Sequence, residues 1–157
     1  MWSKMCVNYH TICRFWLKIL LAMKKYTIQV RSAYEEFWRY NVSVICGGFD
    51  ASGDKIDFVS AQSFVAPVGA PLQAQPEGMD GPRELKVSTQ PCESITAYVY
   101  VVPVVLPKAR DVADYPPFDL RIKISCDKQV IYNEVRKICQ WSGDSIELKF
   151  PAEAPVR

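Results

Sequence analysis

Apolar and polar residues alternate one by one through most of the chain after residue 23. Segment 118–125 is the clearest example, because Phe118, Leu120, Ile122 and Ile124 alternate there with charged or polar residues. A period of two predicts a β-strand with one buried face. The same pattern predicts further strands at 24–31, 40–46, 55–64, 84–89, 94–102, 129–137 and 145–150. In 94–102 both faces are apolar, which predicts a strand covered on both sides.

Residues that favour tight turns separate these strands. The run 47–54 (GGFDASGD) predicts one hairpin and the run 126–128 (CDK) predicts another, while 32–38 is expected to form one helical turn or a bulged connection. Many short strands without a long helical period are typical of an all-β fold. We therefore expect an antiparallel two-sheet β-sandwich of about eight strands, immunoglobulin-like, C2-like or transthyretin-like, with polar outer faces. A closed barrel is the alternative, and the pattern does not set the strand order.

Residues 1–22 differ from the rest of the chain. They carry three bases and no acid, and their apolar run is interrupted by Lys18 and too short to span a membrane. Three interpretations fit: translation that starts at Met23, a secretory signal or anchor without a clear cleavage site, or an amphipathic helix docked on the domain. We prefer the start at Met23, which predicts a cytoplasmic protein. Otherwise the protein is exported or membrane-associated, and membrane contact depends on residues 1–22.

Residues 23–157 are expected to form a single domain that contains one long loop. Residues 66–82 include four prolines and three glycines, which excludes a helix or a central strand. A loop of this length within a compact domain is usually functional or mobile.

The sequence offers little catalytic chemistry. Its single histidine, His10, lies within residues 1–22, so the predicted domain has no imidazole to activate a nucleophile or bind zinc. Gly47-Gly48 is not followed by the lysine and helix of a phosphate loop. Beyond residue 22 the charges nearly balance, which argues against nucleic acid as a partner. We predict no enzymatic activity and no cofactor.

Two groups of residues resemble chemical sites only in part. The four cysteines of the domain lack C-x-x-C spacing and are consistent with two disulfides or with free thiols, of which we prefer the thiols: Cys46, Cys92, Cys126 and Cys139. The run 50–57 begins like a calcium loop, but Lys55 replaces the required glycine and Ala61 the closing glutamate. We therefore expect a turn there, which could bind calcium only if Asp111, Asp114 and Asp119 met it at one end of the sandwich.

The remaining candidates are aromatic residues and residues of the long loop. Five aromatic side chains, which include Tyr132, are expected to pack in the core or to form a binding platform. We expect a non-catalytic interaction or assembly module that binds another protein through a sheet edge or through residues 66–82. The alternative is a sandwich that binds carbohydrate or a lipid surface, with or without the help of calcium. The sequence does not specify a small-molecule ligand. The candidate binding residues are Trp38, Tyr98, Tyr100, Trp141, Pro71, Pro76 and Met79.

Overall fold

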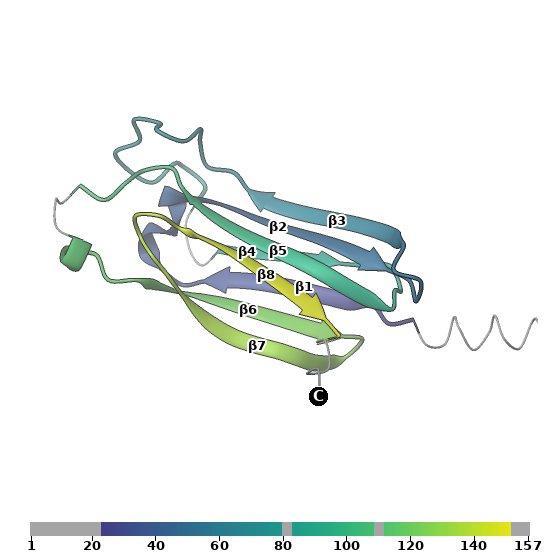
Figure 1. Ribbon diagram of the computed structural model, residues 1–157. Helices are drawn as coiled ribbons and strands as arrows, with labels where there is room; N and C mark the ends of the chain where they lie inside the picture. The colour runs from purple at the N-terminus through teal and green to yellow at the C-terminus, as the bar shows by residue number, and fades with distance from the viewer. Residues whose placement is uncertain (1–22, 80–82, 109–111, 152–157) are drawn as a thin grey trace, which may run out of the picture.

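A computed structural model describes residues 23–79, 83–108 and 112–151 (Figure 1). The interpretations of residues 1–22 concern residues outside this description. The described residues form two antiparallel four-stranded sheets. The first sheet has the order β4 (Arg83–Ser88), β1 (Tyr26–Ser32), β6 (Phe118–Cys126), β7 (Gln129–Ile138). The second has the order β3 (Lys55–Ser63), β2 (Tyr40–Phe49), β5 (Ser94–Pro103), β8 (Asp144–Phe150). The predicted two-sheet β-sandwich is confirmed.

The connections explain why no sheet follows the order of the sequence. Only the predicted hairpins, β2 to β3 and β6 to β7, stay within one sheet, and every other connection crosses between the sheets. The expected turn after β1 is the 3-10 helix η1 (Glu35–Arg39), and a second 3-10 helix, η2 (Val112–Asp114), precedes β6. None of these helices is long and apolar enough to cross a membrane.

The core lies between the inward rows of the two sheets. Period-two alternation places every second side chain on the same face, so that Val30 of β1 and Ile122 of β6, which are register partners, both point inward. Each of the two side chains is at most 2% exposed. Burial of such an aliphatic side chain contributes about 1.5–3 kcal/mol before the entropy of ordering is subtracted. The inward rows also include Tyr26, Ile28, Val42, Val44, Cys46, Ile95, Ala97, Val99, Leu120, Ile124, Ile146 and Leu148.

The outer faces of the two sheets differ, which corrects two expectations. The prediction that β5 is covered on both sides is wrong, because its outward residues Tyr98 and Tyr100 are half-exposed and Val102 is 41% exposed. The prediction of polar outer faces fits β1, β4 and β6 of the first sheet, but its edge strand β7 exposes Val135 at 42%, and the second sheet presents Phe58, which is 58% exposed. The second sheet therefore has an apolar surface that no described part of the chain covers.

One end of the sandwich gathers the longest connections, and we call it the loop end (left in Figure 1). The chain after β3 lies there against the chain after β5, since the Gly69 amide donates to the Val104 carbonyl at 3.2 Å. The Val104 amide in turn donates to the Arg39 carbonyl at 2.7 Å, which joins both loops to η1. The opposite end carries the two hairpin turns.

Candidate functional site

Two of the sequence-predicted aromatic residues share the outer face of the second sheet. The rings of Tyr98 and Tyr100 lie 6.2 Å apart between centroids, with planes within 10° of parallel. The Tyr98 hydroxyl donates to Oε1 of Glu147 on β8 at 3.1 Å, and this bond holds the ring across the neighbouring strand. We call the surface around this pair the apolar face; it comprises Ile45, Phe49, Phe58, Tyr98, Tyr100 and Val102.

A hollow of about 370 Å³ lies in the apolar face. Gly47 forms part of its lining, between its register partners Phe58 on β3 and Thr96 on β5. The ring of Phe49 lies over Gly47, so that a Cβ atom there would be 3.3 Å from the ring and the ring would have to move. The hollow is shallow and mostly apolar, and a side chain of a partner molecule fits it better than a polar metabolite does.

The free edge of β3 borders the apolar face. Antiparallel pairing to β2 occupies one edge of β3, and no strand in the described ranges pairs with the other. Its outward side chains include Ile56 and Phe58, which are 46% and 58% exposed, and Phe64 directly after the strand is 58% exposed. We call Ile56, Phe58 and Phe64 the apolar row. An open edge beside exposed apolar side chains is a template for pairing with another chain.

The two tryptophans of the predicted platform lie at the loop end, on different elements from the tyrosines. Trp38 belongs to η1 and is 9% exposed, so it contributes mainly to packing. Trp141 follows β7, is half-buried and meets the ring of Tyr115 edge-on, with centroids 6.3 Å apart. Tyr132 points inward from β7 and packs edge-on against Phe150, 5.7 Å away. The structure thus separates the five aromatic residues into three places.

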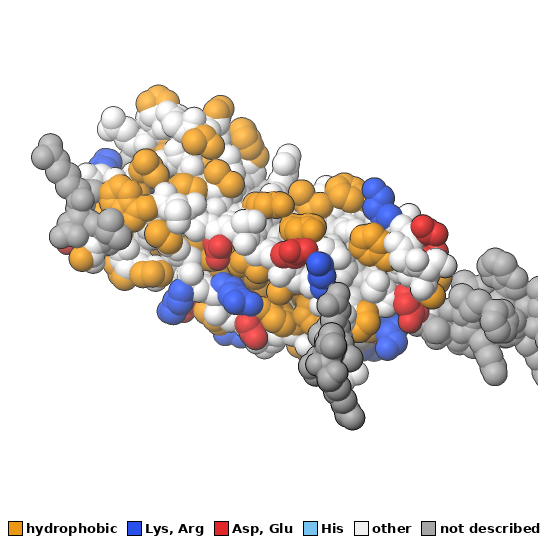
Figure 2. Space-filling model, viewed as in Figure 1, with side chains coloured by type: hydrophobic (Ala, Val, Ile, Leu, Met, Phe, Trp, Pro, Cys, Tyr) orange, Lys and Arg blue, Asp and Glu red, His pale blue; other side chains and the backbone are white. Residues whose placement is uncertain are grey.

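The predicted loop residues lie in a segment of turns at the loop end. Pro71 is exposed, whereas Pro76 and Met79 are half-buried. The Met79 amide donates to the Pro76 carbonyl at 3.3 Å, which closes one of the turns. Hydrophobic side chains crowd this end of the molecule and few charged ones lie there (Figure 2). Val68 is 69% exposed, so the exposed apolar surface continues from the apolar row into the loop.

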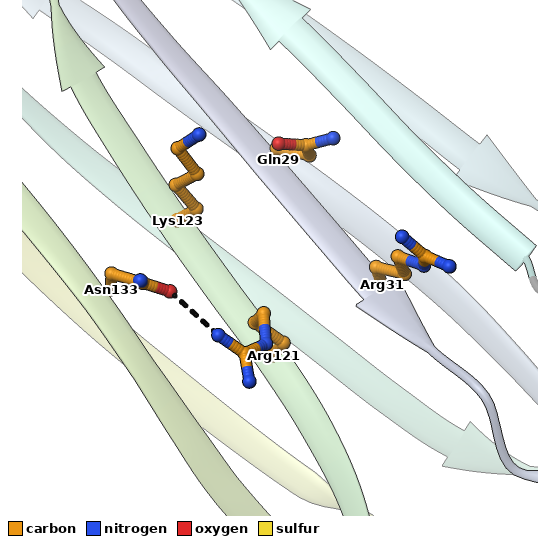
Figure 3. A pocket seen from close by; sticks show the side chains of 5 residues that line it. All are labelled: Gln29, Arg31, Arg121, Lys123 and Asn133. Atoms are coloured by element: carbon orange, nitrogen blue, oxygen red, sulfur yellow. Dashed lines mark hydrogen bonds between the residues drawn. The ribbon is translucent and has the colours of Figure 1, made fainter. Parts of the chain in front are cut away.

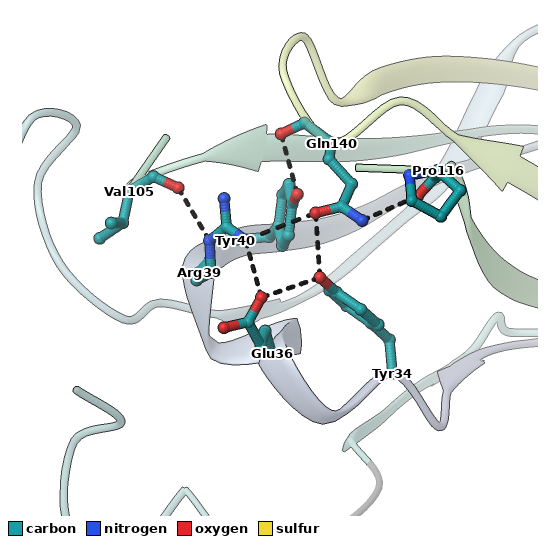
Figure 4. A network of polar contacts seen from close by, with 7 residues as sticks. All are labelled: Tyr34, Glu36, Arg39, Tyr40, Val105, Pro116 and Gln140. Carbon is teal, nitrogen blue, oxygen red and sulfur yellow. Dashed lines mark hydrogen bonds and ion pairs between the residues drawn. The ribbon is translucent and has the colours of Figure 1, made fainter. Parts of the chain in front are cut away.

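A buried polar network fixes η1 at the loop end (Figure 4). Arg39 is 4% exposed, and its guanidinium donates to Oε2 of Glu36 at 2.9 Å and to the Val105 carbonyl at 3.2 Å. Gln140, also 4% exposed, accepts from the Tyr34 hydroxyl at 3.0 Å. Buried polar groups of this kind stabilise a fold only when they are paired, and this network joins four segments that are distant in the sequence.

Gln140 completes the network from the chain that follows β7. Its side-chain amide donates to the Pro116 carbonyl at 2.7 Å, and its own backbone carbonyl accepts from the Tyr40 hydroxyl at 2.9 Å. One guanidinium nitrogen of Arg39, Nη2, is buried without a hydrogen-bond partner among the described residues. A cavity of about 130 Å³ lies beside Arg39, and Lys108, Trp38 and Tyr115 also line it. The cavity is narrow, and the network around it has a structural role.

The cysteines differ strongly in environment, and all four are free thiols. Burial raises the pKa of the Cys46 thiol to about 12, and burial also raises the pKa of Cys92. Cys139 is exposed, and hydrogen bonds from the Ser142 side chain and from backbone amides lower its thiol pKa. A lowered thiol pKa and exposure make Cys139 the most reactive of the four described cysteines. The nearby base Lys137 pairs with Asp119.

The carboxylate of Asp50 closes the hairpin turn between β2 and β3. Oδ1 of Asp50 accepts from the amides of Ser52 at 2.9 Å and Asp54 at 3.0 Å, an arrangement typical of an Asx-type turn. Among the residues that the structure covers, no group of three or more possible ligands could hold a metal ion. Asp111 lies outside the described residues.

Comparisons with known proteins add no function. No protein-family model and no curated protein match the chain. A solved structure of a domain of unknown function, DUF4425, from Bacteroides vulgatus is similar in fold, with 11% sequence identity and a TM-score of 0.42. The alignment covers 81% of this chain and 95% of that chain. A likeness of that degree supports no transfer of residues or activity.

Proposed function

We propose that the domain is a non-catalytic module that binds another protein, and that an extended segment of this partner pairs with the free edge of β3. The observation that carries the proposal is the unpaired edge together with the apolar row. Backbone groups on such an edge supply hydrogen bonds, and pockets for alternate side chains supply specificity. In this proposal the side chains of the added strand contact the apolar row, whereas the hollow of the apolar face lies farther in, over β2, β5 and β8.

The other edge strands support the choice of β3 by contrast. Proteins blunt exposed edges with charged side chains, because these oppose pairing with another chain. β4, β7 and β8 each carry three charged residues, whereas β3 carries only Lys55 and Asp57, both in its first three positions. From Phe58 to Phe64 the chain carries no charge. β3 therefore carries the fewest charged residues of the four edge strands, and the contacts of the first sheet to it, from Arg83 to Ser63 and from the Gln90 amide to Asp57, involve side chains of β3 and leave its backbone edge unpaired among the described strands.

The chemistry of the domain favours binding over catalysis. The described residues include no histidine, and the two buried thiols have raised pKa values, so neither offers a ready nucleophile. The reactive thiol, Cys139, lies in the turn before β8 and has no acid–base partner in the described part of the chain. Binding through main-chain pairing needs none of this chemistry.

A matched pair of variants tests the proposal. Phe58→Lys places a charge in the apolar row, and Val135→Lys places one at a position of similar exposure on β7, the edge of the other sheet. The full chain and both variants are purified from their native cells, and the proteins that co-purify are quantified by mass spectrometry. We expect Phe58→Lys to lose a specific partner that Val135→Lys keeps. Equal recovery in both variants, or a purified chain that pairs only with itself in sedimentation, would overturn the proposal.

A further inference from the structure

The outer face of the first sheet contains a hollow of about 320 Å³ that is lined only by polar side chains (Figure 3). We call it the basic hollow, and it comprises Gln29, Arg31, Arg121, Lys123 and Asn133. These residues come from three neighbouring strands, β1, β6 and β7, and their side chains project from the same face. Three of the five carry a positive charge and none carries a negative charge.

One pair of these bases is placed unfavourably for the fold. Arg31 and Arg121 are register partners on adjacent strands, so two like charges stand directly opposite each other on one face. Like charges in this arrangement destabilise a sheet. Lys123 lies two residues from Arg121 on β6. Lys86 of β4 lies on the same outer face and is the register partner of Gln29. Four bases thus surround one glutamine.

Two acids, Glu84 and Asp119, lie on the same face beside the basic hollow, but neither lines it. Within the described residues the ion pairs form elsewhere, and none includes Arg31, Arg121 or Lys123. Asp119 lines an adjoining hollow that also contains both arginines, but its carboxylate pairs with Lys137. Glu84 is the register partner of Arg31 on β4 and does not line the basic hollow. An external anion is the group that this cluster lacks.

The amide side chains indicate what kind of anion fits. Nη1 of Arg121 donates to Oδ1 of Asn133 at 3.3 Å, which holds the guanidinium beside Asn133 and leaves the Asn133 side-chain NH2 to donate to a ligand. Amides and guanidinium forks together suit a ligand with both hydroxyl groups and planar or tetrahedral oxyanions. No aromatic residue lines the hollow to stack a nucleobase, and no apolar residue lines it to meet a lipid chain.

We propose that the basic hollow binds an acidic oligosaccharide, with the arginines on its carboxylate or sulfate groups and the amides on its hydroxyl groups. This site lies on the sheet opposite the apolar face, so its ligand and the protein partner proposed above occupy different surfaces. In the described residues the three bases of the hollow form no ion pair, so positive charge remains on this face for an anionic ligand to offset.

Calorimetric titration of the full chain tests the site with named probes: a heparin octasaccharide, an oligogalacturonate, a neutral cello-oligosaccharide and phosphatidylserine vesicles. We expect at least one acidic oligosaccharide to bind, more weakly as salt rises, and the neutral sugar and the vesicles not to bind. Arg121→Ala should weaken that binding at least about tenfold, because a charge-assisted bidentate contact is lost. The matched control, Arg136→Ala on β7, removes an arginine that already pairs with Glu134 and should leave the affinity unchanged.

A loss of binding in Arg121→Ala can be told apart from unfolding of the variant by its melting temperature. Arg121 is exposed, and its removal relieves repulsion with Arg31 while it loses one exposed hydrogen bond to Asn133, so Arg121→Ala should melt within a few degrees of the unmodified protein. Absence of binding to both acidic oligosaccharides, equal affinity for free sulfate ion, preferred binding to the vesicles, or binding that Arg121→Ala does not weaken would each overturn the proposal.

Discussion

Gly143 occupies a position in the turn before β8 where no other residue fits. Its φ is +66°, and a Cβ atom there would lie 1.8 Å from the backbone oxygen of Val101 on β5. Gly143→Ala therefore carries two costs. The left-handed backbone costs an L-residue about 1–2 kcal/mol. The methyl group must also displace the carbonyl of Val101, whose residue pairs with Asp144, so at least one ladder hydrogen bond worth about 1 kcal/mol is strained or lost.

The expected total for Gly143→Ala is roughly 3 kcal/mol or more of lost unfolding free energy. Gly53→Ala is the matched control, because Gly53 also has a positive φ, +85°, but has nothing within 4 Å of the added Cβ. It should cost only about 1–2 kcal/mol. Urea titrations followed by tryptophan fluorescence compare the two variants, and a domain of this size loses about 2–4 °C of melting temperature per kcal/mol. Equal losses in the two variants would refute the close approach of this turn to β5.

Three further predictions concern thiols, pH and the polar network. Among the four described cysteines, iodoacetamide at neutral pH should alkylate Cys139 first and Cys46 last, as read by peptide mass spectrometry, because the first thiol is exposed with a lowered pKa and the second is buried with a raised one. Burial raises the phenol pKa values of Tyr26 and Tyr34 from 10.0 to about 12, so the folded state holds these protons more tightly than the unfolded chain. Stability should therefore be full below pH 10 and fall between pH 10 and 12 in alkaline denaturation. Tyr40→Phe leaves a buried carbonyl without its donor and should cost about 1–3 kcal/mol in urea titration.

The sequence predicted the strands because their signal is local. Segment 118–125 alternates strictly, and the structure has β6 at Phe118–Cys126 with Leu120 and Ile122 fully buried. The hairpin turns were equally local, since Gly53 supplies the positive φ that the β2 to β3 turn uses. Strand order could not be predicted in this way, because it depends on which strands the connections between the two sheets bring side by side. No local sequence pattern determines this.

The outer surfaces were harder to predict for the same reason. Tyr98 and Tyr100 were named as candidates, but Phe58 was missed, although an apolar residue at an outward position of β3 was a usable signal. The basic hollow required the pairing of β1 with β6, which places Arg31 opposite Arg121 from 90 residues away in the chain. Charge balance over the whole domain concealed this cluster, because it averages the bases of one face against acids elsewhere.

The most direct test of the proposed function is position-specific photo-crosslinking in native cells. A benzophenone amino acid replaces Phe58 in the apolar row or, as a control, Val135 on β7, and both positions are exposed. The proposal predicts an adduct with a different protein at position 58 and none at position 135. An adduct at position 135 alone, an adduct only with a second copy of the chain, or none at either position would contradict it.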